Sequence, residues 1–379
     1  MQNKEVCAPI GVTFNRGLMS DMSDTAPTKT ISDFEAKLDS ADRSVAQFDE
    51  EDASFLQWVR GFLRTNPTTI PAIIILVAII AFGVIANNFM TASTLSLILK
   101  QVTVVGIIAI AQTVVILTAG IDLSVGAILV ISAMVMGRLT TLQDVPFYLA
   151  IPAGLAIGTL MGCVNGVLVT KARIPPLIVT LGTLYIFNAL KLWYTGSESV
   201  RPASLAEKAP ELLWFGQAFN IGGANFILGS FALIVLAFIV WYMLNRTAWG
   251  RHVTAVGDDA DAAMLSGVQI DRTLISVYAL AGLICAFGGW VAIGRVGSMS
   301  PIAFETVALD SITAVVIGGT SLFGGRASII GSVLGAIIVG VFNTGLALAG
   351  VDSYWQLFAS GCLVIIAVAL DQWLRRATQ

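Results

Sequence analysis

The chain has 379 residues, of which 56% are hydrophobic and 12% charged, and its mean hydropathy is +0.84. Soluble domains carry about 25% charged residues, so this composition excludes a soluble globular protein and indicates a membrane protein. Since about 20 apolar residues make one spanning helix, the chain has no room for a sizeable soluble domain besides its spans.

Charge is distributed unevenly along the chain. Residues 1–57 hold eleven acidic and five basic residues, whereas residues 58–379 hold thirteen acidic and sixteen basic ones. An acidic stretch with few large apolar side chains cannot bury enough surface to offset the entropy lost on ordering. We therefore expect an acidic, disordered cytoplasmic tail at 1–57 and a transmembrane domain at 58–379. The tail does not resemble a cleaved signal peptide, so the first span is expected to direct its own insertion.

Ten apolar runs predict an all-α polytopic membrane protein with about ten transmembrane helices. The runs cover residues 70–88, 95–118, 121–137, 147–170, 174–194, 226–245, 273–294, 309–324, 328–349 and 354–374. The third and the eighth are short and rich in glycine, which predicts broken or re-entrant helices.

Orientation follows from the basic residues, because loops rich in Lys and Arg stay on the cytoplasmic side. Counting ten crossings from Arg60 and Arg64 places both termini and the loop 246–272 inside, and the segment 195–225 outside. The other basic residues expected inside are Lys171, Arg173, Arg246, Arg251, Arg272, Arg326, Arg375 and Arg376, and those expected outside are Arg138, Arg201, Lys208 and Arg295.

Glycine is concentrated in the apolar runs. Gly154, Gly158, Gly162 and Gly166 repeat every four residues and form one stripe on the predicted span 147–170. Small residues let helices approach closely in lipid, so the stripe predicts a tight helix contact. The same stripe also suits a seam that slides during transport.

The segment TAGIDLSVG, residues 118–126, separates two apolar runs with an acid and flexible glycines. Asp122 or Ser124 could cap the next helix in a tight turn. Acids inside membranes also line water-filled paths, so the same residues could belong to a broken helix on a translocation path. Both interpretations stay open at this point.

A second break lies at Leu309-Asp310 and GGTSLFGG, residues 318–325. Two glycine-interrupted short spans, one in each half of a chain, point to a site near the middle of the membrane. The residues predicted to line a translocation path are Asp122, Ser124, Asn165, Thr180, Thr183, Asp310, Thr320 and Ser321.

The cytoplasmic loop carries its own pattern. Acidic residues at 258–261 followed by Ala, Met and Leu, with Gly267 as a stop, predict a short helix. Its small residues suit docking into the groove of a partner, and an ordinary interfacial helix is the alternative. The residues predicted to contact the partner are Gly250, Arg251, Ala255, Gly257, Ala262, Ala263 and Gly267.

Several kinds of chemistry are excluded by what the sequence contains. The one histidine, His252, lies in a polar loop, and the four cysteines are widely spaced. This pattern predicts no metal site and no disulfide framework. The phosphate-binding pattern GxxxxGK[ST] does not occur, so the energy for transport must come from another subunit or from an ion gradient.

Together these motifs resemble the permease subunits of bacterial ABC importers for ribose, xylose, galactose and fructose. The resemblance covers about residues 60–376 and rests on TAGIDLSVG, Asn165-Gly166, Thr180-Leu-Gly-Thr183, the Gly250–Gly267 pattern and Leu309-Asp310 with VIGGTSLFGG. One departure is Asp258-Asp259, where the family often has Gly-Asn.

The resemblance implies a multi-pass permease of the bacterial inner membrane that carries a monosaccharide, with fructose or ribose preferred. It also implies a cytoplasmic ABC ATPase that docks on the loop, a periplasmic sugar-binding protein and a second permease copy. No nucleic acid partner is expected. The chain itself would be neither an enzyme nor a cofactor binder, since ATP and Mg would be bound by the ATPase.

Two other classes of membrane protein are less consistent with the sequence. A secondary transporter would bind an ion at acids such as Asp122 or Asp310, but membrane acids are scarce and histidine is absent from the spans. An intramembrane enzyme would need a nucleophile with a base or a metal cluster, and the sequence displays neither.

Overall fold

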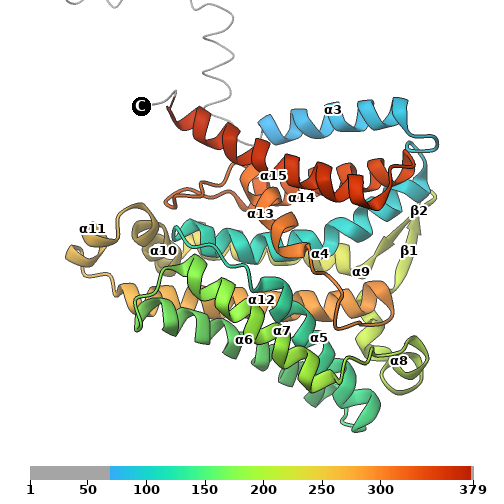
Figure 1. The fold of residues 1–379 in the computed structure, drawn as a ribbon, viewed down its shortest axis with the longest axis horizontal. Coiled ribbons are helices and arrows are strands. Elements are labelled where there is room, and N and C mark those ends of the chain that lie inside the picture. The colour runs from blue at the N-terminus through green and yellow to red at the C-terminus, as the bar shows by residue number, and fades with distance from the viewer. Residues whose placement is uncertain (1–68, 377–379) are drawn as a thin grey trace, which may run out of the picture. The chain divides into compact units, whose positions relative to one another are not determined.

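The computed structural model of this protein describes residues 69–376, so the tail expected at 1–57 lies outside the described residues. Most of the described chain is helical (Figure 1). In chain order the elements are α3 (Thr69–Ile85), α4 (Ala92–Leu117), α5 (Val125–Leu142), α6 (Phe147–Thr170), α7 (Pro176–Thr195), α8 (Pro202–Lys208), the 3-10 helix η2 (Pro210–Gly216), β1 (Ala218–Ile221), β2 (Ala224–Ile227), α9 (Leu228–Arg246), α10 (Ala248–Asp258), α11 (Ala260–Leu265), α12 (Ile270–Val296), α13 (Val307–Ile317), α14 (Ile329–Leu348) and α15 (Ser353–Arg376).

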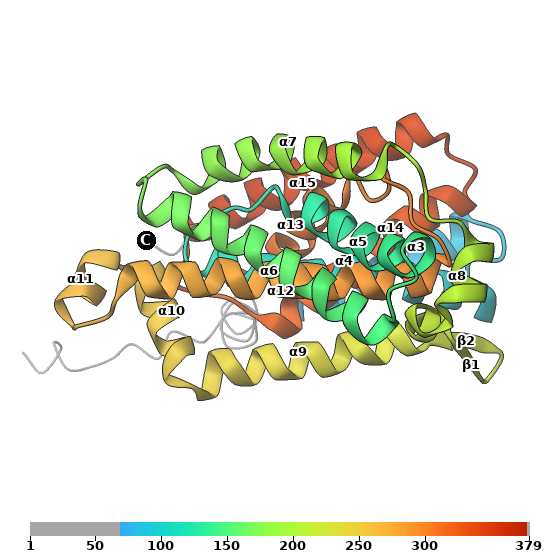
Figure 2. The same ribbon diagram turned by 90° about the horizontal axis from the view of Figure 1, so that it is seen from below.

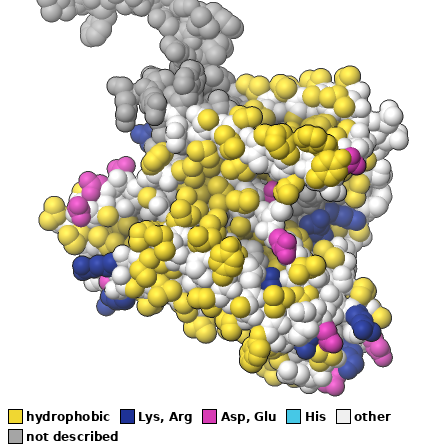
Figure 3. Space-filling view, viewed as in Figure 1, with side chains coloured by type: hydrophobic (Ala, Val, Ile, Leu, Met, Phe, Trp, Pro, Cys, Tyr) yellow, Lys and Arg dark blue, Asp and Glu magenta, His cyan; other side chains and the backbone are white. Residues whose placement is uncertain are grey.

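The long helices lie side by side, and the short elements gather at their two ends (Figures 1 and 2). Helices α10 and α11 lie at one end, which we call the α10–α11 end. Helix α8 and the hairpin of β1 and β2 lie at the opposite end, which we call the hairpin end. In the face seen in Figure 3, hydrophobic side chains cover much of the surface between the ends, and charged side chains gather near α10–α11 and α8.

Within the described residues, seven helices are long and apolar enough to cross a membrane: α4, α5, α6, α7, α9, α12 and α14. Three further apolar stretches are shorter: Pro71–Ile85 within α3, Val307–Ile317, which is α13, and Ser353–Ile366 within α15. Each of these ten elements corresponds to one predicted apolar run. By length and composition, seven helices can therefore span a membrane. A total of ten spans requires α3, α13 and α15 to cross the membrane as well.

Helices α4 and α5 lie at the centre of the packing. In their most apolar windows, 72% of the α4 residues and 83% of the α5 residues are buried inside the protein, against 17% for α9. A helix that is apolar on all sides can be surrounded by protein or by lipid. The difference in burial therefore identifies α4 and α5 as core helices and α9 as a peripheral one.

The glycine stripe of α6 packs against α12. A Cβ added to Gly158 would lie 2.8 Å from the carbonyl oxygen of Gly282, and one added to Gly162 would overlap the carbonyl group of Tyr278. The two helices approach backbone to backbone, which only glycine allows. The predicted tight helix contact is confirmed.

Two ion pairs agree with the predicted sides of the loops. Lys171 pairs with Asp271, and both residues are predicted inside. Lys208 pairs with Asp144 at 2.7 Å, and both lie in loops predicted outside. Each pair therefore joins two loops that were predicted to lie on the same side.

Three details differ from the sequence-based expectation. The segment 195–225, for which the all-α expectation allowed no strands, contains α8, η2 and part of a two-stranded antiparallel sheet in which Ala218 lies opposite Ile227. The fold is thus mainly but not entirely α-helical. Helix α13 ends at Ile317, short of the predicted 324, because the following turn needs a positive φ of 86° at Gly319. The cytoplasmic loop forms two helices instead of one.

Candidate functional site

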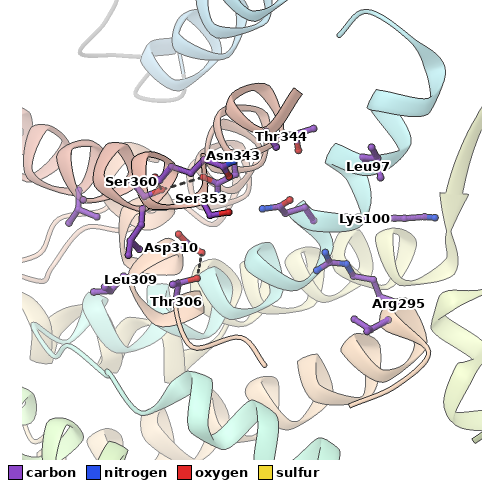
Figure 4. Close-up of a pocket in the computed structure, with 17 residues that line it drawn as sticks. Leu97, Lys100, Arg295, Thr306, Leu309, Asp310, Asn343, Thr344, Ser353 and Ser360 are labelled. Carbon is purple, nitrogen blue, oxygen red and sulfur yellow. Dashed lines mark hydrogen bonds between the residues drawn. The ribbon is translucent and has the colours of Figure 1, made fainter. Parts of the chain in front are cut away.

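A large pocket of about 890 Å³ lies among five helices toward the hairpin end. It is formed by α4, α12, α13, α14 and α15, and Figure 4 shows their side chains converging on it. The lining residues are Leu97, Lys100, Gln101, Arg295, Val296, Thr306, Leu309, Asp310, Asn343, Thr344, Ala347, Ser353, Gln356, Leu357, Ser360, Gly361 and Val364. Its volume falls within the range of about 300–1,000 Å³ that is usual for small-molecule sites. We call it the five-helix pocket.

Three charged side chains line the five-helix pocket: Lys100 from α4, Arg295 from α12 and Asp310 from α13. Among the described residues no ion pair of 4.0 Å or less joins any two of them. The carboxylate of Asp310 accepts a hydrogen bond from the Thr306 hydroxyl at 3.1 Å. Charged groups that are not neutralised by one another keep donors and acceptors free for a polar ligand.

Uncharged polar groups complete the lining. Ser360 of α15 donates to Oδ1 of Asn343 of α14 at 3.4 Å (Figure 4). Gln101, Ser353 and Gln356 add further donors and acceptors. Leucine side chains at positions 97, 309 and 357 supply apolar surface between them. The mixture matches a molecule that carries hydroxyl groups on a carbon ring.

Helix α13 brings its first turn to this pocket. It has eleven residues, its N-cap is Thr306, and Asp310 lies in its first turn. A half-length helix whose N-terminus points into a cavity is a recurring way to build substrate sites in transporters. The predicted broken span at 309–324 therefore corresponds to the short helix α13, whose N-terminal end lies at the pocket.

Of the eight residues predicted to line a path, only Asp310 lines the five-helix pocket. Three of the others form a buried network beside the C-terminal half of α4. The amide and the hydroxyl of Ser124 donate to Oδ1 of Asp122 at 2.8 and 2.6 Å, and Nδ2 of Asn165 donates to the Ser124 hydroxyl at 2.8 Å. All three residues are at most 1% exposed. The local arrangement is a tight turn, but Ser124, the N-cap residue of α5, makes no side-chain capping bond. The path role of these residues stays a prediction.

The turn is also held by the helices around it. The Thr180 hydroxyl of α7 donates to the carbonyl oxygen of Ile121 at 2.9 Å. Gln112 of α4 pairs with the backbone of Asp122 in the amide orientation that satisfies both groups, with both contacts at 3.1 Å. The hydroxyl of Thr183 bonds back to the carbonyl of Thr180 at 3.4 Å. These bonds fasten the segment 118–124 to α4, α6 and α7.

Thr320 and Ser321 lie in the turn between α13 and α14. The Thr320 oxygen accepts from the amide of Ser328 at 3.2 Å, and the Ser321 oxygen accepts from the amide of Phe323 at 3.2 Å. Both side chains are buried and shape the turn. Their role on a path stays a prediction.

The residues predicted to contact a partner divide into two groups. Gly250, Gly257 and Ala263 are buried against the protein, and Ala255 is half-buried. Arg251, Ala262 and Gly267 are exposed. Asp259 caps α11 by accepting from the amides of Asp261 and Ala262 at 2.9 and 3.0 Å. The exposed group is available to another chain, whereas the buried group fixes α10 and α11 in place.

Two exposed apolar residues extend the accessible surface of α11. Leu265 is 87% exposed and Met264 is 56% exposed. The sequence pattern did not predict a contact role for either residue, because that prediction relied on the small residues and glycines of the loop. Large apolar side chains in an otherwise polar loop were the signal that could have identified them.

Comparison with known proteins identifies the family. The family described as "Branched-chain amino acid transport system / permease component" matches residues 94–368. The chain belongs to this permease family. With seven helices between residues 69 and 376 that are long and apolar enough to span, the permease is a multi-pass protein of the inner membrane.

Curated relatives align with the permease over most of its length. It is 50% identical over 345 residues to the fructose import permease protein of Rhizobium meliloti, covering 91% of this chain and 96% of that one. It is 38% identical to the ribose import permease protein of Bacillus subtilis, covering 80% and 92%, and 36% identical to the galactose/methyl galactoside import permease protein of Escherichia coli, covering 79% and 91%. No solved structure gives a significant match.

Proposed function

We propose that this permease is the membrane subunit of an ATP-driven ABC importer that carries a monosaccharide, fructose first, into the cell by alternating access. The 50% identity to a fructose import permease over nearly the whole chain carries this proposal. The preference for fructose over ribose follows from the lower identity, 38%, to a ribose permease.

The five-helix pocket supports the substrate class. Its donors on Arg295 and its acceptors on Asp310 and Asn343 suit the several hydroxyl groups of a sugar, whereas the ammonium group of Lys100 points away from these side chains (Figure 4). A translocation path has to release its substrate, so a polar pocket with modest affinity is sufficient. Tight binding would be the task of the periplasmic sugar-binding protein.

The partners follow from the two ends of the fold. The exposed surface of α10 and α11 would receive the ATPase, and the hairpin end would receive the sugar-binding protein. Ten crossings, with α3, α13 and α15 included, would place both termini on the ATPase side. A second permease copy would complete the transporter.

The first test is affinity purification of the tagged full-length chain from its native membranes in mild detergent, followed by mass spectrometry. We expect an ATPase with the GxxxxGK[ST] motif in amounts that match the permease. Vesicles that contain the complex and the binding protein should then take up fructose only when ATP is present. An excess of ribose should compete with this uptake less than an excess of unlabelled fructose. A chain that purifies alone and takes up sugar when an ion gradient is applied would instead be a secondary transporter.

A further inference from the structure

Three segments that are distant in the sequence meet at the α10–α11 end. The amide of Gly325 donates to the carbonyl oxygen of Leu117 at 3.0 Å. A Cβ added to Gly257 would overlap that same carbonyl group and would lie 3.0 Å from the Gly325 nitrogen. A Cβ added to Gly324 would overlap the carbonyl oxygen of Gly257. We call these four residues the glycine junction.

The glycine junction leaves no room for relative movement of its parts. Gly257 is buried, and Gly324 and Gly325 have positive φ angles of 85° and 73°, which favour glycine. At such a contact a push on one backbone segment is passed directly to the next, because no side chain lies between them to adjust. Movement of the end of α10 must therefore displace the end of α4 and the turn between α13 and α14.

The helices that meet at the glycine junction are also those that line the five-helix pocket at their other ends. Helix α4 ends at Leu117, α13 ends shortly before Gly324, and α14 starts shortly after Gly325. They supply eight of the seventeen lining residues: Leu97, Lys100, Gln101, Leu309, Asp310, Asn343, Thr344 and Ala347. A helix rises about 1.5 Å per residue, so the part of α4 from Leu97 to Leu117 bridges about 30 Å between the two places.

We infer that the glycine junction is the link through which a shift of α10 and α11 opens or closes the five-helix pocket. Gly257 is a positioning residue, since it acts through α4, α13 and α14 and touches no substrate. The inference rests on the proposed function, because the partner that moves α10 and α11 would be the ATPase. The movement of α10 and α11 would pass to the pocket through the backbone contacts of the glycine junction. Small shifts at these contacts would be amplified by the rigid packed helices.

The test compares Gly257→Ala with Gly182→Ala in the full complex with its ATPase and binding protein. Gly182 lies in α7 with open space around its missing Cβ, so it is a control for the same chemical change without crowding. For Gly257→Ala we expect the ATPase to co-purify and to hydrolyse ATP within about twofold of wild type, while sugar uptake falls about tenfold or more. The control should retain uptake.

Hydrogen exchange of the same samples separates transmission from assembly. In wild type, adding ATP with vanadate should change exchange in residues 250–267 and in residues 297–310 at the pocket. In Gly257→Ala only residues 250–267 should respond. If residues 297–310 of Gly257→Ala responded to ATP with vanadate as in wild type, or if its sugar uptake were normal, the inference would be wrong. Loss of the ATPase from Gly257→Ala but not from wild type would also overturn it. Absence of an ATPase from wild type as well would instead overturn the proposed function, and the inference with it.

A measurement on wild type covers the case in which Gly257→Ala does not accumulate. The Gly325 amide, bonded to Leu117, should stay protected from exchange in both nucleotide states, because the junction moves as one unit. If this amide became exposed when ATP binds, the junction would come apart during the cycle and the inference would be wrong.

Discussion

Nζ of Lys191 donates a hydrogen bond to Oδ1 of Asn188 at 2.7 Å, although only 5% of the lysine is exposed. The two residues lie three positions apart on α7, so the helix itself provides the acceptor. A buried ammonium group is costly unless it is paired or hydrogen-bonded. The Asn188 side chain therefore stabilises the buried ammonium group of Lys191 and, with it, the packing of α7.

Replacing Asn188 with Leu should lower the free energy of unfolding by about 2–3 kcal/mol, since it leaves the ammonium without this acceptor. Thermal unfolding in detergent measures the loss. The double variant with Lys191→Met should regain most of it, because charge and acceptor are then removed together. Equal instability of the single and double variants would show that the volume of the side chain, and not the charge, matters.

Replacing Asp122 with Ala removes the acceptor for the amide and hydroxyl of Ser124 and should cost about 1–3 kcal/mol of stability. Asp122→Asn keeps an oxygen at the same place, so it should be close to wild type in stability and in sugar uptake. Uptake in vesicles and thermal unfolding are the two readouts. A stable Asp122→Asn protein that no longer transports would favour the predicted path role of the carboxylate over the turn.

Asp310→Asn should lower sugar uptake about tenfold by raising KM, because a charged acceptor is lost from the five-helix pocket. Co-purification of the ATPase should not change. Asp271→Asn is the matched control, since Asp271 pairs with Lys171 on the surface, outside the pocket and outside α10 and α11, where such pairs contribute little. If both variants transported normally, the five-helix pocket would not be the sugar path.

Leu265→Asp should reduce the amount of ATPase that co-purifies by about tenfold, since exposed apolar anchors dominate binding at interfaces. The control is Leu142→Asp, in which a leucine that is 58% exposed at the hairpin end is changed in the same way. Quantitative mass spectrometry of the purified complexes gives the ratio. Full retention of the ATPase in Leu265→Asp would exclude this part of α11 from the contact.

The helices could be predicted because apolar runs are the dominant signal in a membrane protein. The run 147–170 coincides with α6, and the runs for α4, α7, α9, α12 and α14 differ from the helices by a few residues at each end. The hairpin was missed because two strands of four residues each in a polar segment carry too little pattern for a strand prediction.

The candidate site was predictable only in part. Asp310 could be identified because an acid stands out in an apolar run. Arg295 had no signal, because its place depends on how α12 ends beside α4 and α13. Likewise, the sequence showed Asp122, Thr320 and Gly257 as three separate features, and only the packing shows that their segments lie close to the end of α4.

The length of α13 accounts for the presence of the five-helix pocket. Eleven helical residues rise about 16 Å, roughly half of the 30 Å hydrocarbon thickness of a membrane. The chain from Gly297 to Thr306 takes the remaining distance without a regular helix, and the cavity occupies space that a full-length helix would fill with side chains. An insertion that extended α13 by two turns at its first residue would therefore plug the transporter without altering any residue that touches the substrate.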